Sequence, residues 1–298
     1  MAITTYAELV TAIQTYTADN STATTAQIDD WIRLAEFRIF YGSGDPIMSR
    51  PLRHRLMETS TQLTVPTYQV GNTSAGTANV QIVTLPTTPS PGAGLAFTFT
   101  AGFTNTSAMT LSANGIVTGP FVKGANGDTL DPGDVQAGGL YAVYYDGSIY
   151  ILMPGDAAMP LPTRFLGGRM CYLSGSIRKV PYINSDDSGA LRLSVNGCYT
   201  VEGTALRFIG VAGGALVDFK YYRKPAPLIT NLNDIFREAP NLWLYAALVE
   251  GGIFLQNDAM VQKWYTYFSG ATQGYMNTDA ATRDGTAQTF IQAYGVIV

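Results

Sequence analysis

Apolar residues recur at helical spacing near the N-terminus. Two stretches place them on one face of an expected helix, the first with Tyr6, Leu9, Val10 and Ile13 and the second with Ile28, Trp31, Ile32, Ala35 and Ile39. Thr5 and Glu8 fit a capping box, in which each side chain satisfies a free amide at a helix start. Residues 24–27 repeat this signal, and Gly42 predicts the end of the second helix. Residues 1–42 are therefore predicted to form a helical hairpin.

Two further helices are predicted near the C-terminus. One begins near Pro240, a favourable first-turn residue. Its interior glycines, Gly251 and Gly252, cost about 1 kcal/mol each relative to alanine, so we expect a neighbouring helix to approach closely there. The other begins at residue 257 or 258, with one apolar face formed by Val261, Trp264, Phe268, Ala271 and Tyr275. Because each of the four helices is expected to have one apolar face, a single four-helix bundle from both chain ends would bury them.

Between the helices, apolar and polar residues alternate as they do in β-strands. Alternation around residues 80–85, 95–99 and 141–145 predicts strands with one buried face. Asn-Gly or Asp-Gly pairs at 114–115, 126–127 and 146–147 predict hairpin turns. Short strands at this spacing indicate an all-β domain, either a sandwich or jelly-roll-like. Further strands are expected at 176–183, 191–195, 199–201, 206–209 and 216–222.

The charge content changes sharply along the chain. Residues 67–158 hold one Lys, five Asp and no Arg, Glu, His or Cys, which leaves 17 basic and 17 acidic residues elsewhere. All of the net charge of −4 therefore lies in the middle segment. This boundary predicts an inserted β-domain at 67–158 within a host domain of residues 1–66 and 159–276, followed by a C-terminal arm at 277–298. The expected fold class is α+β, with a β-domain between the two halves of the helix bundle.

The composition argues against several classes of function. Charged residues make up 13% of the chain, about half the usual ~25%, and the net charge is negative, which disfavours a basic nucleic-acid binder. One His and two Cys do not make a zinc cluster, and we expect Cys171 and Cys198 to be reduced and buried. Common nucleotide-binding, hydrolase and metalloprotease motifs are absent from the sequence. We expect no enzymatic activity, no cofactor, no metal and no membrane segment.

A basic cluster and three tryptophans are candidates for partner contacts. Arg50, Arg53 and Arg55, together with His54, could contact DNA or an acidic partner. The favoured alternative is a solvated turn with weak ion pairs. The tryptophans could be interface anchors, although their positions in or beside apolar stripes favour core packing: Trp31, Trp243 and Trp264.

Two groups of residues in the middle segment could bind ligands. Asp128, Asp131 and Asp134 could hold Ca²⁺, but they lack EF-hand spacing, so turn roles are favoured. Tyrosines could stack on sugar rings, with Tyr141 and Tyr145 expected on one face and Tyr144 and Tyr150 on the other. One of these two sets is expected to lie in the core.

Four stretches, in this order along the chain, carry a family resemblance. They read TYAELVTAIQTYTADNSTATTAQIDDWIRLAEFRIF, LPTRFLGGRMCYLSG, FKYYRKPAPLI and PNLWLYAALVEGGIFLQNDAMVQKWYTYF. The first contains an "aLAE-x-R-I"-like motif formed by Leu34, Ala35, Glu36, Arg38 and Ile39. Together they resemble the head-to-tail adaptor (connector) proteins of short-tailed bacteriophages. In the middle segment, FTNTSAMTLSANG and LDPGDVQAGGLYAVYYDGSIYILM are similar to a β-module of phage tail and fibre proteins.

The resemblance implies a structural protein of the virion. Such adaptors form a ring, usually of twelve copies, beneath the portal. The ring extends the channel for double-stranded DNA, without specific binding, and provides a platform for tail nozzle or tail fibre proteins. We expect assembly in the host cytoplasm and a final location at the head–tail junction. Apolar residues of the arm would dock on the portal, although an ordinary frayed terminus is the alternative: Phe290, Ile291, Tyr294, Val296 and Ile297.

Two other functions remain open from the sequence. One is a tail or fibre-associated protein whose β-domain binds a host glycan. The other is a hydrolase of cell-wall sugar, since a pair of catalytic carboxylates can lie far apart in a chain.

Overall fold

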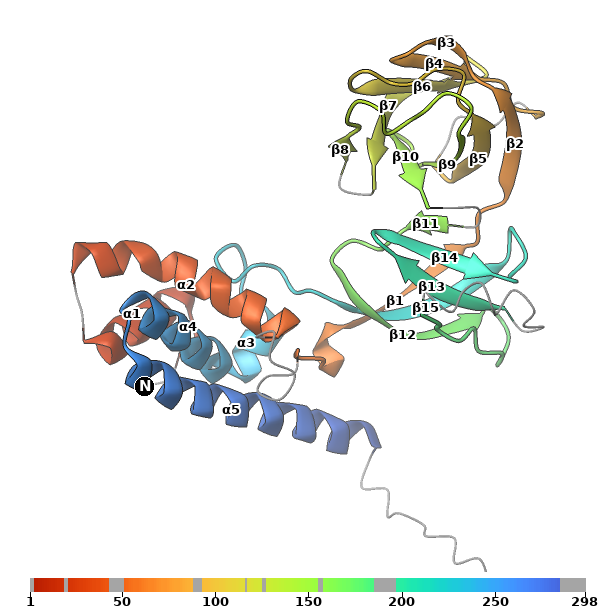
Figure 1. The fold of residues 1–298 in the computed structure, drawn as a ribbon. Helices are drawn as coiled ribbons and strands as arrows, with labels where there is room; N and C mark the ends of the chain where they lie inside the picture. Colours follow the sequence, from red (N-terminus) through yellow and green to blue (C-terminus); the bar gives the residue numbers. More distant parts are fainter. Residues whose placement is uncertain are drawn as a thin grey trace, which may run out of the picture. The chain divides into compact units, whose positions relative to one another are not determined.

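The computed structural model describes residues 3–18, 21–42, 51–87, 93–115, 117–124, 127–154, 158–184 and 197–284. The fold is α+β, with two compact units (Figure 1). The first unit combines Met1–Glu58 with Tyr222–Val298, and the second spans Thr59–Tyr221. Both ends of the chain therefore contribute to the helical unit, and the β-strands between them form the other.

The helices begin where the local capping signals predict, with one exception. The described helices are α1 (Tyr6–Thr17), α2 (Thr22–Tyr41), α3 (Asp234–Glu238), α4 (Pro240–Phe254) and α5 (Asp258–Asp284), with a short 3-10 turn, η1, at Arg55–Met57. The capping box is confirmed, because Thr5 Oγ1 accepts from Glu8 N at 3.2 Å and Glu8 Oε2 accepts from Thr5 N at 3.0 Å. The predicted cap of the second helix was wrong, since Ser21 accepts from Thr24 N and the helix starts at Thr22.

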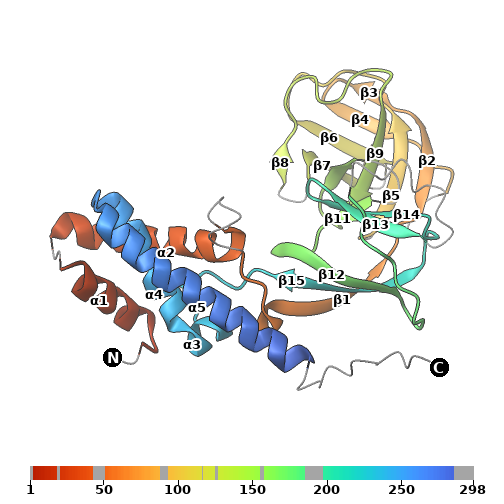
Figure 2. The same ribbon diagram turned by 60° about the horizontal axis from the view of Figure 1, so that its bottom comes forward.

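Helix α4 lies at the centre of the helical unit and packs against α1, α2 and α5 (Figures 1 and 2). The expectation of one apolar face per helix is wrong for α4, because its buried residues fall on every side: Leu242, Trp243, Leu244, Ala246, Ala247, Leu248, Val249, Gly251 and Gly252. A helix that is apolar all round belongs in an interior. The described contacts centre on α4 and do not show the expected four-helix bundle.

The close approach predicted at the α4 glycines is confirmed. A Cβ at Gly251 would lie 2.9 Å from Cζ3 of Trp31 in α2. A Cβ at Gly252 would lie 2.9 Å from Cγ2 of Val261 in α5. Helix α5 then continues to Asp284, so the expected extended arm from residue 277 is wrong for its first residues.

The inserted segment forms a mixed sheet that curls into a nearly closed barrel (Figure 1). Its described strands are β2 (Tyr68–Thr73), β3 (Ala75–Thr77), β4 (Val80–Val83), β5 (Leu95–Thr100), β6 (Met109–Ala113), β7 (Val117–Lys123), β8 (Asp128–Thr129), β9 (Leu140–Tyr145) and β10 (Tyr150–Met153). They follow the order β2-β5-β9-β10-β7-β6-β4-β3, and β8 pairs with β7. This single curled sheet replaces the expected sandwich or jelly roll.

The barrel nearly closes because β2 and β3, which follow each other in the chain, are the first and the last strand in the order of the sheet. Strand β2 pairs with β5 in parallel, and β3 pairs with β4 antiparallel, although Ser74 alone separates β2 from β3. At the seam, Asn72 N donates to Thr84 O at 3.1 Å and Ser74 N donates to Thr100 O at 2.8 Å. Side chains that point inward form the core: Val83, Leu85, Phe97, Phe99, Leu111, Phe121, Val143, Tyr145 and Tyr150.

The remaining strands form two sheets within the described residues. One has the order β1 (Glu58–Thr64), β15 (Leu216–Arg223), β12 (Phe165–Leu173), and the other has the order β11 (Ala158–Pro160), β14 (Ala205–Ile209), β13 (Cys198–Glu202). The hairpin predicted around Gly203 is confirmed. The strand predicted at 176–183 is wrong, since only isolated bridges occur there among the described residues. The one predicted at 191–195 lies outside them, and the domain limits at 67 and 158 stay predictions.

Candidate functional site

The polar residues of the α2 motif tie the two ends of the chain together. Glu36 Oε1 accepts a hydrogen bond from Leu228 N at 2.6 Å, and its burial raises the pKa of this carboxyl. Arg38 Nε lies 2.7 Å from Glu250 Oε1 in α4, with both side chains largely buried. The motif is therefore structural at these two positions.

The basic cluster also makes contacts inside the helical unit. Arg53 Nη1 donates to Phe40 O at 3.0 Å and to Leu52 O at 2.8 Å, and burial lowers the pKa of this guanidinium. The Arg55 side chain is 44% exposed, and Arg50 lies outside the described residues. Contact of these arginines with DNA or a partner stays a prediction.

A buried carboxylate fixes the C-terminal part of α5 to the same loop. Asp279 Oδ1 accepts from Arg55 N at 3.2 Å and lies 3.5 Å from His54 Nε2. The His54 ring stacks on Tyr275, with centroids 4.2 Å apart. Tyr275 Oη donates to Glu238 Oε2 at 2.9 Å, and burial with this bond raises the pKa of Tyr275. These contacts fix the position of α5 as far as Asp279. The expected docking residues of the arm lie outside the described residues: Phe290, Ile291, Tyr294, Val296 and Ile297.

The acidic residues of the barrel occupy turn roles. Lys123 Nζ lies 2.7 Å from both Asp131 Oδ2 and Asp134 Oδ2. Asp134 also accepts from the Asp131 amide, while Asp128 opens β8. No cluster of three metal-ligating side chains occurs in the part of the chain that the structure describes.

Three of the four candidate tyrosines belong to the barrel core. Tyr145 and Tyr150 are buried with ring centroids 4.6 Å apart, and Tyr141 packs partly buried beside them. Tyr144 packs outside the barrel against the neighbouring sheets. The expectation that Tyr150 shares a face with Tyr144 was wrong, because alternation does not carry across the turn between β9 and β10. The candidate tryptophans and cysteines are also buried, as expected for core residues: Trp31, Trp243, Trp264, Cys171 and Cys198.

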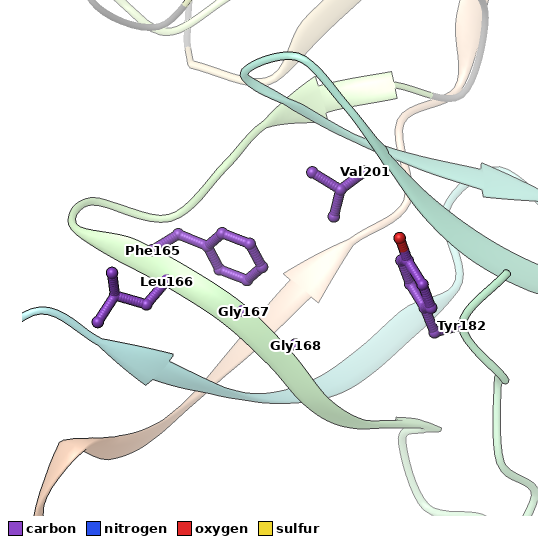
Figure 3. A pocket seen from close by; sticks show the side chains of 6 residues that line it. All are labelled: Phe165, Leu166, Gly167, Gly168, Tyr182 and Val201. Atoms are coloured by element: carbon purple, nitrogen blue, oxygen red, sulfur yellow. The ribbon is translucent and has the colours of Figure 1, made fainter. Parts of the chain in front are cut away.

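A pocket of about 350 Å³ lies beside β12 in the β-unit (Figure 3). Its lining is mainly apolar and comes from Phe165, Leu166, Gly167, Gly168, Tyr182 and Val201. A Cβ at Gly168 would lie 2.6 Å from the Tyr199 hydroxyl, so the glycine is needed for packing. This lining offers one phenol and no carboxylate or imidazole, so it contains no acid–base pair.

Helix α2 also exposes an apolar stripe on the side opposite its core face. Leu34, Phe37 and Tyr41 follow the spacing i, i+3, i+7, and Phe37 is 59% exposed. The Phe37 and Tyr41 rings lie 4.7 Å apart, and Lys224 Nζ lies 5.3 Å from the Tyr41 ring. Exposed aromatic side chains are enriched at protein interfaces. The apolar pattern of the sequence did not lead to a prediction of this stripe, although a second helical periodicity, opposite the buried one, was the available signal.

Comparison with known proteins relates part of the chain to a protein family. Residues 147–289 match the family model of the SU10 adaptor protein, from the last barrel strand to beyond α5. No curated protein matches the chain. None of the described helices is long and apolar enough to cross a membrane. The family match supports a phage adaptor-type protein, a structural component of the virion that interacts with other head or tail proteins of the phage.

Proposed function

We propose that this chain is a head-to-tail adaptor that forms a ring beneath the portal, with twelve copies as the expected number. The ring would extend the DNA channel and provide the platform for tail nozzle or tail fibre proteins. The family match over residues 147–289 is the main support for the proposal. The matched range includes β-strands as well as the helices α3, α4 and α5.

The surface of the helical unit supports an assembling protein. Leu34, Phe37 and Tyr41 expose a continuous apolar stripe, which a chain that remains alone would leave in water. A ring needs two different surfaces on each copy, so that one copy's first surface meets its neighbour's second. The apolar part of the arm, at residues 290–297, would dock on the portal and lock the ring.

In this role the protein would let DNA slide without binding it specifically. Each phosphate contact adds salt-dependent affinity, which would slow the passage of DNA. The internal hydrogen bonds of Arg53 agree with such a channel, because they engage a guanidinium that could otherwise grip phosphate. The proposal includes no enzymatic step, and assembly would take place in the host cytoplasm.

Mass photometry of the purified chain, alone and mixed with the phage's portal ring, tests the proposal. We expect a monomer or weak oligomer alone and a saturating, symmetric layer on the portal, visible by negative-stain microscopy. A stable trimer that ignores the portal would contradict it. That result would favour the alternative of a tail or fibre-associated protein, and a glycan array would then test its barrel.

A further inference from the structure

We propose that neighbouring copies meet through two particular faces, the apolar stripe of α2 on one copy and a face of α5 on the next that has a single charged residue. This inference rests on the proposed ring and names the surfaces that would build it. The α2 face consists of Asp30, Leu34, Phe37 and Tyr41, all exposed. Their spacing is 4, 3 and 4 residues, which keeps them on one narrow stripe.

The α5 face has the same spacing and the opposite shape. It consists of Lys263, Tyr267, Gly270 and Gly274, all exposed. A Cβ at Gly270 or Gly274 would meet nothing within 4 Å, so no contact within the described chain requires these glycines. Glycine is unfavourable inside a helix, so a close approach from outside the chain is a physical reason for both.

The α5 face also lacks charge over most of its length. Residues 264–278 contain no Asp, Glu, Lys or Arg, although several of their side chains face solvent. The cores of protein interfaces are depleted in charged residues in this way. An exposed helix surface in a free monomer ordinarily carries such residues.

A parallel, in-register pairing of the two faces makes them complementary in charge and in size. Asp30 would meet Lys263 at one end, and Leu34 would pack on Tyr267. The bulky rings of Phe37 and Tyr41 would then enter the spaces above Gly270 and Gly274. The two faces have the same length, with 11 steps from first to last residue, or about 16.5 Å of helix at 1.5 Å per residue.

The arrangement of the helices allows this pairing around a ring. Helices α2 and α5 run in the same direction, and α4 lies between them (Figures 1 and 2). The two faces therefore belong to different sides of one copy. In a ring of many copies the rotation between neighbours is small, so α2 of one copy and α5 of the next keep nearly the same direction.

Charge reversal on the full chain tests the pairing at its polar end. Asp30→Lys and Lys263→Asp should each weaken formation of the portal-bound layer at low salt by about two- to fivefold per contact, and the double reversal should restore it. Gln262→Asp is the control, because it also places a carboxylate on α5, but beside the face, and should have little effect. Equal losses for Lys263→Asp and Gln262→Asp, or no rescue in the double variant, would overturn the pairing.

Cross-linking tests the glycine end and the direction of assembly. With Phe37→Cys and Gly270→Cys in one chain, a short bismaleimide should join copies into a ladder of dimers, trimers and larger species on the portal. The native thiols of Cys171 and Cys198 are buried and have raised pKa values, so they should not react. Phe37→Cys with Gln273→Cys, which lies off the face, is the control and should give no ladder.

Gly270→Leu separates assembly from folding. A Cβ at this exposed position meets nothing within 4 Å, and leucine favours a helix more than glycine, so thermal stability should not fall. The leucine side chain should fill the space for Phe37 and prevent the layer. If the Gly270→Leu variant forms a normal layer and the cysteine pair gives no ladder, the proposed interface is overturned, but the proposed adaptor function is not. Failure of the unchanged chain to bind the portal would overturn both. A dimer from Phe37→Cys alone would indicate a two-fold contact and refute the head-to-tail pairing.

Discussion

Replacement of glycine by alanine should have opposite effects in α4 and α5. At Gly270 and Gly274 the new methyl group meets nothing within 4 Å, so only the helix preference for alanine remains. That preference is about 0.8–1 kcal/mol per residue, so the double change should raise the free energy of unfolding by about 1.5–2 kcal/mol. At Gly251 the methyl carbon would lie 2.9 Å from Cζ3 and 3.0 Å from Cε3 of buried Trp31. Overpacking typically costs about 1–3 kcal/mol, so we expect Gly251→Ala to be destabilising by about 1 kcal/mol net.

Urea unfolding of the free chain, followed by far-UV circular dichroism, measures both effects. Gly252→Ala serves as a second test of close approach, since its methyl group would lie 2.9 Å from Val261 Cγ2 and 3.1 Å from the Val261 backbone nitrogen. The reasoning would be refuted if the α5 double variant lost stability, or if Gly251→Ala gained it. Either result would mean that the helices pack differently around α4.

Three further predictions concern buried polar groups. Glu250→Gln should lower the free energy of unfolding by about 2–3 kcal/mol, because it leaves the Arg38 guanidinium without its carboxylate 2.7 Å away; the double change with Arg38→Met should recover part of this loss in urea titrations. Asn105→Ala should cost about 2–4 kcal/mol in thermal denaturation, since three side-chain hydrogen bonds to backbone groups are lost from a buried site. Burial raises the pKa of Tyr199 and of Cys171 to about 12, so the unfolded chain loses these two protons at a lower pH than the folded chain does. Their contribution to the free energy of unfolding is therefore complete below about pH 9 and is lost as the pH rises through about 12. Stability should therefore fall between about pH 9 and about pH 12, and less steeply in Tyr199→Phe; an unchanged slope in that variant would contradict the assignment.

Local signals in the sequence predicted the positions of most helices and several turns. The Thr5 capping box is present, and Pro240 occupies the first turn of α4. Asn114 and Gly115 both have positive φ, 52° and 67°, as the predicted hairpin turn requires. The approach of another helix at Gly251 was also predictable, because a glycine inside a helix needs a reason. These features depend on a few neighbouring residues, so they can be predicted from a short stretch of sequence.

The features that depend on distant partners were not predictable in the same way. Periodicity identifies which side chains are apolar, but it does not say what covers them, so the enclosure of α4 and the exposure of Phe37 were both missed. The curling of the barrel depends on one stretch of chain that pairs with β5 before Ser74 and with β4 after it, and periodicity along the chain does not indicate such a double pairing. Tyr150 was assigned to the wrong face because alternation does not carry across the turn between β9 and β10: in their register Tyr150 lies opposite Tyr145, so these two side chains share a face.

The seam between β2 and β3 has a consequence for crowding. An open sheet presents rows of unpaired amides and carbonyls at its edges, and these rows recruit other strands when copies are held close together. In the barrel, the stretch on either side of Ser74 pairs with β5 in one direction and with β4 in the other, so the two ends of the sheet meet along one stretch of chain and the barrel nearly closes. Many identical barrels could therefore be held side by side at high local concentration without joining edge to edge. Such resistance to aggregation would suit the barrels of the proposed ring.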